Sequence, residues 1–394
     1  MLGTDTLATA NRWSELFRGS ILSLLLITLS LTSTYATPTD KDALAAARRG
    51  DFPTALQIWR SLAKSGDVKA EFYLGGMYAV GQGVPQDYAQ ALTWFQKAAD
   101  HGDADAQYFL GAMYEGGLGV QQDYTQAVKW LQKAADQGQA AAQEALGGMY
   151  EYGQGVPKNL GRALSYYRQA ADHGYSAAEF DLGVMYKSGE GIPQDYAQAL
   201  TWFTKAADQG NADAQFTLGV MFYSGDGVAK DYERALTWYR KAADQGNADA
   251  QTNLGVMYEN GAGIPQDYAQ ALTWFQKGAN QGDAVAEYDL GSMYANGEGV
   301  PQDYAKAIDW YRKSADTGYA SAQAALGSMY EDGDGVPISH VQAYFWLNLA
   351  VSRLPPFKGD ERDRDVSLRD RVASELTPAQ IAEAQKLASE WKPK

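Results

Sequence analysis

One unit of 36 residues recurs eight times along the chain, and this period constrains the fold more than any other feature. A methionine marks each copy without a slip in spacing, and an aromatic residue follows at a second fixed position. The methionines are Met77, Met113, Met149, Met185, Met221, Met257, Met293 and Met329, and the aromatic residues are Trp94, Trp130, Tyr166, Trp202, Trp238, Trp274, Trp310 and Trp346. Such a period is typical of solenoids, in which each unit packs only against its neighbours.

Each copy predicts two helices. In the copy at residues 102–138, Leu110 and Met113 lie on one helical face, and a glycine-rich segment ends that helix. Asp123 is predicted to cap a second helix, which carries Trp130. No window alternates apolar and polar residues with the period of two that a strand shows. We therefore expect an all-α chain built from antiparallel helix pairs.

The composition excludes several classes of function. The chain carries a net charge of −15, and residues 1–36 contribute none of it. Such an acidic chain argues against DNA, RNA or anionic lipid as the main ligand, so proteins, glycans or basic peptides are the expected partners. There is no cysteine, which excludes disulfides, thiolate metal sites and cysteine nucleophiles.

Residues 1–36 are predicted to form a signal peptide. Arg12 and Arg18 precede an uncharged apolar run of about 11 residues, and residues 34–36 form a small-x-Ala cleavage pattern. The run is too short for a membrane-spanning helix, which needs about 20 residues. We expect cleavage and a periplasmic or secreted protein, with an uncleaved anchor as the alternative. No later segment is apolar enough to span a membrane.

The two ends of the chain depart from the full copies. Residues 37–66 are predicted to form an incomplete first repeat, and residues 67–353 hold the eight copies. Residues 354–394 contain a linker, a charged helix at about 361–376, and a last helix that begins with a capping box at Thr377. The last helix is expected to carry on one face Ile381, Ala384, Leu387 and Trp391. We expect this segment to cover the final repeat, which has a neighbour on one side only.

The motif within a copy points to a known family. In the copy at residues 212–247 it consists of Ala214, Leu218, Gly219, Met221, Gly225, Gly227, Asp231, Tyr232, Ala235, Trp238, Ala242, Ala243 and Gly246. This motif resembles the Sel-one-like repeat, a relative of the tetratricopeptide repeat, over residues 67–353. The resemblance implies a right-handed α-solenoid that acts as an adaptor for protein–protein contacts, and exported bacterial members often serve the cell envelope. Relatives that bind or cleave β-lactams carry a cysteine pair in each repeat, which this chain lacks, so β-lactam hydrolysis is a remote alternative.

The residues that could carry chemistry are better explained by structure. His101 and His173 occupy one repeat position at the end of the second helix, where a cation complements the helix dipole. Ser61 and Lys64 match part of a serine β-lactamase motif, but its companion motifs and a strand are missing. The acidic loop residues lack calcium-binding spacing; they are Glu190, Asp226, Glu298 and Asp334. We predict no enzyme activity, catalytic residue, metal site or cofactor.

The strongest functional signal is a set of positions that differ between copies. Along the first helix, the positions i, i+4, i+7 and i+11 change from copy to copy, whereas packing positions repeat. We call this set the variable stripe; its i+4 members are Tyr73, Phe109, Ala145, Asp181, Thr217, Asn253, Asp289 and Ala325. If the first helices line a concave face, as in tetratricopeptide relatives, the stripe forms a groove that is aromatic near the N-terminus and polar to acidic from Asp181 to Asp289. The alternative is sequence drift on a solvated surface.

These observations predict a non-enzymatic scaffold of the bacterial cell envelope that binds a segment of a partner protein on the concave face. The residues expected to contact the partner are Tyr73, Asp105, Phe109, Asp181, Thr217, Asn253 and Asp289. The alternative is an accessory protein that binds peptidoglycan or an exopolysaccharide, which the many tyrosines and tryptophans favour.

Overall fold

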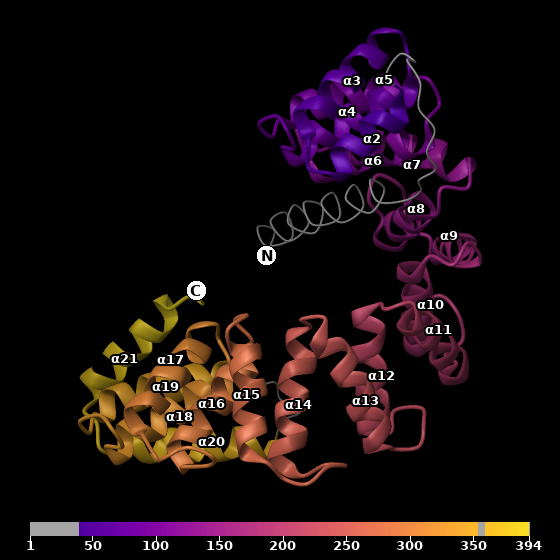
Figure 1. Ribbon diagram of the computed structural model, residues 1–394. Helices are drawn as coiled ribbons and strands as arrows, with labels where there is room; N and C mark the ends of the chain where they lie inside the picture. Colours follow the sequence, from indigo (N-terminus) through magenta and orange to yellow (C-terminus); the bar gives the residue numbers. More distant parts are fainter. Residues whose placement is uncertain (1–38, 354–358, 394) are drawn as a thin grey trace. The chain divides into compact units, whose positions relative to one another are not determined.

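The computed structural model describes residues 39–353 and 359–393, and within these ranges it contains twenty helices, α2 to α21, and no strand (Figure 1). The predicted signal peptide and residues 354–358 of the predicted linker lie outside the described residues. None of the described helices is both long and apolar enough to cross a membrane. The all-α prediction is confirmed.

Every repeat contributes one helix pair. The first helices are α4 (Val68–Val80), α6 (Ala104–Gly116), α8 (Ala140–Tyr152), α10 (Ser176–Ser188), α12 (Ala212–Ser224), α14 (Ala248–Asn260), α16 (Ala284–Asn296) and α18 (Ala320–Asp332). The second helices are α5 (Tyr88–Asp100), α7 (Tyr124–Asp136), α9 (Leu160–Asp172), α11 (Tyr196–Asp208), α13 (Tyr232–Asp244), α15 (Tyr268–Ala279), α17 (Tyr304–Asp316) and α19 (His340–Arg353). The chain divides after Ala206 into two compact units, which we call unit 1 (residues 1–206) and unit 2 (residues 207–394).

The local sequence accounts for where these helices begin and end. The carboxylate of Asp123 accepts hydrogen bonds from the amides of Thr125 and Gln126 at 2.9 and 3.0 Å, which satisfies two amides that the first turn of α7 leaves open. Gly117 ends α6 in the left-handed region, with φ of 66°, and its amide donates to the carbonyl of Met113. Equivalent caps recur along the array, so the predicted helix starts are confirmed.

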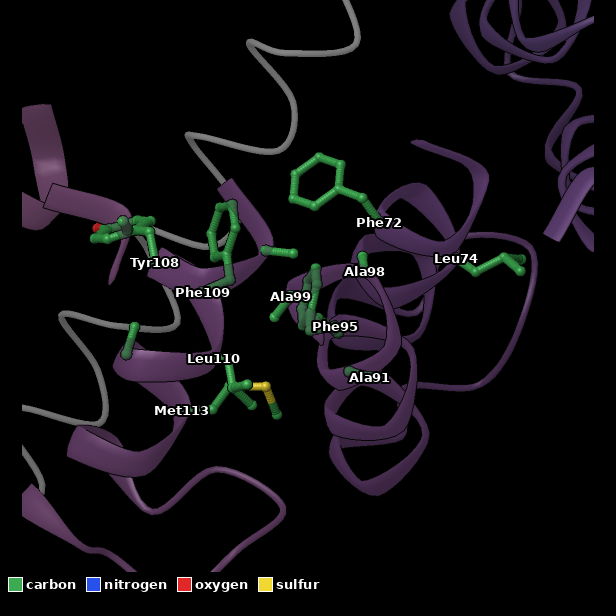
Figure 2. Close-up of a cluster of buried hydrophobic side chains, with 14 of the residues drawn as sticks. Phe72, Leu74, Ala91, Phe95, Ala98, Ala99, Tyr108, Phe109, Leu110 and Met113 are labelled. Carbon is green, nitrogen blue, oxygen red and sulfur yellow. The ribbon is translucent and has the colours of Figure 1, made fainter. Parts of the chain in front are cut away.

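The recurring Leu-Gly pair lets the two helices of a repeat approach closely. On α8, a Cβ atom added to Gly147 would lie 2.5 Å from the ring of Tyr167 on α9, whereas one added to Gly148 would meet nothing nearer than 3.8 Å. The second-helix aromatic therefore packs directly on the first-helix backbone. Figure 2 shows this core in unit 1, where the ring of Phe95 lies 5.7 Å from that of Phe72 and 5.4 Å from that of Phe109.

A buried glutamine links successive repeats. The side-chain amide of Gln107 donates to the carbonyl of Ala99 on the preceding second helix at 3.1 Å, and its oxygen accepts from Gln137 at 2.8 Å. The same pair of bonds is made by Gln251, with Ala243 and Gln281. His101 and His173 lie at the C-caps of α5 and α9, as predicted, and each also hydrogen-bonds from its ring to the residue at this glutamine position, which is Glu71 or Gln143.

Glu287 occupies the glutamine position in the seventh repeat, and we expect Glu287→Gln to stabilise the protein by about 1–2 kcal/mol at neutral pH. The side chain is 7% exposed, and Oε2 has no hydrogen-bond partner. Burial raises the pKa of this carboxyl, so the stability it contributes is present at low pH and is lost as the pH rises through the raised pKa. A glutamine would instead donate to the carbonyl of Ala279, as Gln251 donates to that of Ala243.

Urea denaturation at neutral pH measures this effect, with Gln251→Glu as the reverse substitution, expected to destabilise. Attraction between Glu287 and Lys313 offsets part of the gain. A loss of stability on Glu287→Gln would contradict the prediction.

Additional helices flank the array at both ends. α2 (Asp40–Arg48) and α3 (Phe52–Lys64) precede the first full repeat, and α20 (Gly359–Ala373) and α21 (Pro378–Glu390) pack against α19. The capping box at Thr377 is present. Ala384 of α21 is buried, but Leu387 is 45% exposed, so the expectation that it shares the covered face is wrong. Trp391 lies beyond the helix end, where its ring lies 4.3 Å from the guanidinium of Arg353.

Candidate functional site

The variable stripe is defined in the structure by four positions on each first helix. In unit 1 it consists of Lys69, Tyr73, Gly76 and Val80 on α4, Asp105, Phe109, Ala112 and Gly116 on α6, Ala141, Ala145, Gly148 and Tyr152 on α8, and Ala177, Asp181, Val184 and Ser188 on α10. In unit 2 it consists of Asp213, Thr217, Val220 and Ser224 on α12, Asp249, Asn253, Val256 and Asn260 on α14, Val285, Asp289, Ser292 and Asn296 on α16, and Ser321, Ala325, Ser328 and Asp332 on α18.

The stripe contains most of the large apolar side chains that are exposed among the described residues. Among the residues that the structure describes, five large hydrophobic side chains are exposed, and three of them belong to the stripe. These are Tyr152 (67% exposed), Val184 (40%) and Val285 (38%); the other two, Ile338 and Leu387, lie elsewhere. Tyr152 and Val184 belong to unit 1 and Val285 to unit 2, so each unit carries exposed apolar side chains at stripe positions. The sequence pattern located these stripe positions but did not predict that these three side chains would be exposed.

Near the N-terminus, the predicted aromatic end of the stripe is partly core. The ring of Phe109 is 3% exposed and stacks on Phe95, so our prediction that Phe109 contacts a partner is not supported by its position. It fills the space between α5 and α6, where a large apolar ring gains more from burial than from exposure. Tyr73 is only partly buried and stacks on Trp59 with ring centroids 4.8 Å apart.

The two predicted acidic site residues of unit 1, Asp105 and Asp181, interact with other residues of the protein. The ammonium of Lys69 binds the carboxylate of Asp103 at 2.8 Å and lies 3.8 Å from that of Asp105. The charge of Asp181 lies near Tyr167, whose hydroxyl donates to Glu151 at 2.6 Å. Burial first, and then these carboxylates, raise the pKa of the Tyr167 phenol. Asp105 and Asp181 are therefore stripe residues with charged or polar neighbours.

In unit 2 the three predicted residues have different environments. Thr217 is partly buried, and the amide of Asn253 donates to the backbone carbonyl of Asp249 at 2.8 Å. Asp289 differs, because its Oδ2 is buried and has no hydrogen-bond partner. Burial, followed by the charges of Glu259 and Asp283, raises the pKa of Asp289 to about 7. Asp289 thus carries an unmet hydrogen-bonding capacity on the stripe.

Further carboxylates near Asp289 also have raised pKa values, and the sequence pattern did not single them out. Burial, together with Asp283 and Asp213, raises the pKa of Asp249, and burial with Glu298 raises that of Glu259. The negative charges of these carboxylates act on one another, so each disfavours ionisation of its neighbours. Asp213 and Asp249 occupy the first stripe position on their helices, so the variation between repeats could have identified them. Glu259 lies outside the stripe, and that variation does not point to it.

A pocket of about 400 Å³ lies in unit 2 among α16, α17 and the repeat that contains α18. Three stripe residues line it: Asn296, Ala325 and Ser328. The remaining lining residues are Ala295, Gln302, Tyr304, Tyr311, Met329 and Asp334. The pocket is therefore continuous with the stripe. Among the described residues, no group of three or more acidic or histidine side chains could hold a metal ion.

Helix pairs that repeat every 36 residues define an α-solenoid repeat protein. The Sel1 repeat model matches residues 68–103, 104–139, 140–175, 176–211, 212–247, 248–283, 284–319 and 320–353. The chain therefore belongs to the Sel1 repeat family, whose members generally mediate protein–protein interaction.

Solved structures include similar proteins. A Sel1 repeat protein from Oxalobacter formigenes is 34% identical, with 62% of this chain and 96% of that chain covered and a TM-score of 0.57. The protein c5321, a protective antigen of uropathogenic Escherichia coli with an SLR fold, is 30% identical, with 96% and 94% covered and a TM-score of 0.41. No curated protein matches the chain.

Proposed function

We propose that this protein is an exported, non-enzymatic scaffold of the bacterial cell envelope that binds a segment of a partner protein along the variable stripe. The observation that carries the proposal is that three of the five exposed large apolar side chains of the described residues occupy positions that differ between repeats. Export rests on the predicted signal peptide at residues 1–36. Binding of a protein segment also agrees with the general role of Sel1 repeats.

The stripe has the mixed chemistry that a protein segment requires. Val184 and Val285 offer apolar surface whose burial favours association, and Asp181 and Asp289 lie one turn from them on the same helices. Protein interfaces combine such apolar contacts with a polar rim that fixes the register of the bound segment. We therefore place the partner across these positions in each unit.

Photocrosslinking tests the proposal. Val184 and Val285 are each replaced by the photoreactive residue p-benzoylphenylalanine in the full chain, and crosslinked proteins from cells are identified by mass spectrometry. Ile338, which is 62% exposed but lies off the stripe, is the matched control. We expect the two stripe positions to capture the same partner and Ile338 to capture none of it. Equal capture from all three positions, or none from the stripe, would overturn the proposal.

The structure gives less support to the glycan-binding alternative. Sugar rings bind proteins by stacking on open aromatic faces, but in six repeats a lysine covers one face of the tryptophan, with 3.7–4.2 Å between the ammonium and the ring centroid. The pairs are Trp94 with Lys97, Trp130 with Lys133, Trp202 with Lys205, Trp238 with Lys241, Trp274 with Lys277 and Trp310 with Lys313. Sedimentation with purified cell wall distinguishes the two functions, because a protein scaffold stays in the supernatant.

A further inference from the structure

We propose that the pocket among α16, α17 and α18 holds one cationic side chain of the bound segment, an arginine or a lysine, which the nearby charge of Asp289 attracts. This inference rests on the proposed function, because it assigns a specific contact to the segment that the stripe binds.

Two of the polar side chains that line the pocket, Gln302 and Asp334, present acceptors to it. The side-chain amide of Gln302 donates to the carbonyl of Ala295 at 2.8 Å and to the hydroxyl of Tyr304 at 3.1 Å. Because an amide nitrogen carries two hydrogens, only the side-chain oxygen of Gln302 is left for a ligand. Asp334 adds a carboxylate, and no lysine, arginine or histidine lines the pocket. A ligand rich in donors fits this arrangement.

Asp289 adds negative charge behind the pocket wall. It lies seven residues before the lining residue Asn296 on α16, two turns along the same face. Its charge acts on Tyr311, which also lines the pocket. The buried Oδ2 of Asp289 has no hydrogen-bond partner in the protein. A cation bound in the pocket would therefore favour the ionised form of Asp289 through its charge, without direct contact with the buried oxygen.

The surroundings favour a cation over a neutral donor. Glu259 and Asp283 lie close enough to Asp289 to disfavour its ionisation, and Glu298 acts on Tyr311 in the same sense. A cation placed among these groups relieves their mutual repulsion, whereas a neutral amide does not. The volume of about 400 Å³ is at the lower end of the range for small-molecule pockets, which suits one side chain rather than a folded surface.

The repeat architecture provides a direct readout. Each repeat contains one methionine, and Met329 lines the pocket, so ¹³C-methyl labelling of methionine places a reporter in the site and internal controls in the other repeats. The probe is N-acetylarginine amide, titrated into the full chain at a pH above the pKa of Asp289 of about 7. N-acetylcitrulline amide, which has nearly the same shape but no charge, is the control.

We expect the arginine probe to shift the Met329 signal saturably, while Met77 and Met113 stay unchanged and the citrulline probe has no effect. Asp289→Asn and Asp334→Asn are each expected to raise the dissociation constant by about tenfold, since each removes a negative charge that attracts the probe. The remaining methionine signals report that these variants are folded. Equal shifts with both probes, or no saturable shift at Met329, would overturn the inference.

This experiment separates the inference from the proposed function. If the arginine probe fails to bind but Val285 still captures a partner by photocrosslinking, the cation site is wrong and the scaffold function stands. If Met329 responds to the probe but neither stripe position captures a partner, the pocket is a cation site and the proposed function fails.

Discussion

Replacing Gly147 with alanine is expected to destabilise the protein by about 3 kcal/mol, while the same change at the adjacent Gly148 is expected to stabilise it by about 0.5–1 kcal/mol. At Gly147 the added methyl group would lie 2.5 Å from the ring of Tyr167, so α8 and α9 must move apart. At Gly148 the nearest atom would be 3.8 Å away, and alanine gains its higher helix propensity without a clash.

Urea denaturation followed by circular dichroism measures both effects. The two variants are matched controls for each other, because they differ by one position on the same helix. A repeat array does not always unfold in one step, so hydrogen exchange of α8 and α9 is measured alongside the denaturation curve. Similar effects of the two substitutions would contradict the account of helix packing.

The Asp289→Asn variant is expected to be more stable than the natural protein above pH 7, by up to about 4 kcal/mol, because each pKa unit corresponds to about 1.36 kcal/mol. Burial and neighbouring carboxylates raise the pKa of Asp289 from 3.8 to about 7. A raised carboxyl pKa favours folding below the unfolded-state pKa, and this contribution is lost as the pH rises through 7. Residual exposure of the side chain lowers the gain below this upper bound.

Denaturation curves on either side of pH 7 measure the gain, which is expected to shrink towards zero as the pH falls to the unfolded-state pKa of aspartate. The reverse substitution Asn253→Asp is the control, because Asn253 holds the corresponding position of the preceding repeat and hydrogen-bonds to its own helix. An equal gain for Asp289→Asn at every pH would show that ionisation is not its cause.

The helix boundaries could be predicted from the sequence because the capping residues that set them act on amides close by in the chain. Asp123 and Thr377 cap helices through bonds to amides two or three residues away, so the residues needed lie in the same short segment. The position of Phe109 could not be predicted in this way. Whether an aromatic residue on the first helix faces outward depends on the space that the neighbouring helix leaves, here filled against Phe95.

The candidate site, too, could be predicted from the sequence only in part. The variation between copies located the stripe, including Asp289, because that comparison needs only the sequence. It could not reveal that Oδ2 of Asp289 lacks a partner, or that Glu259 on α14 and Asp283 at the start of α16 act on it. These charge interactions link Asp289 with residues 30 and 6 positions away in the chain, and the packing of the helices brings them near one another.

The glutamine links between repeats have a consequence for how such an array can change in length. Gln107 and Gln251 make the same pair of bonds to a preceding and a following residue, at the same sequence separations. Duplication or deletion of 36 residues between two such glutamine links recreates the same link. The array can therefore gain or lose a repeat there without a new interface between repeats. At the seventh repeat Glu287 and Thr317 replace the two glutamines, so a duplication that ends there would not recreate the same pair of bonds.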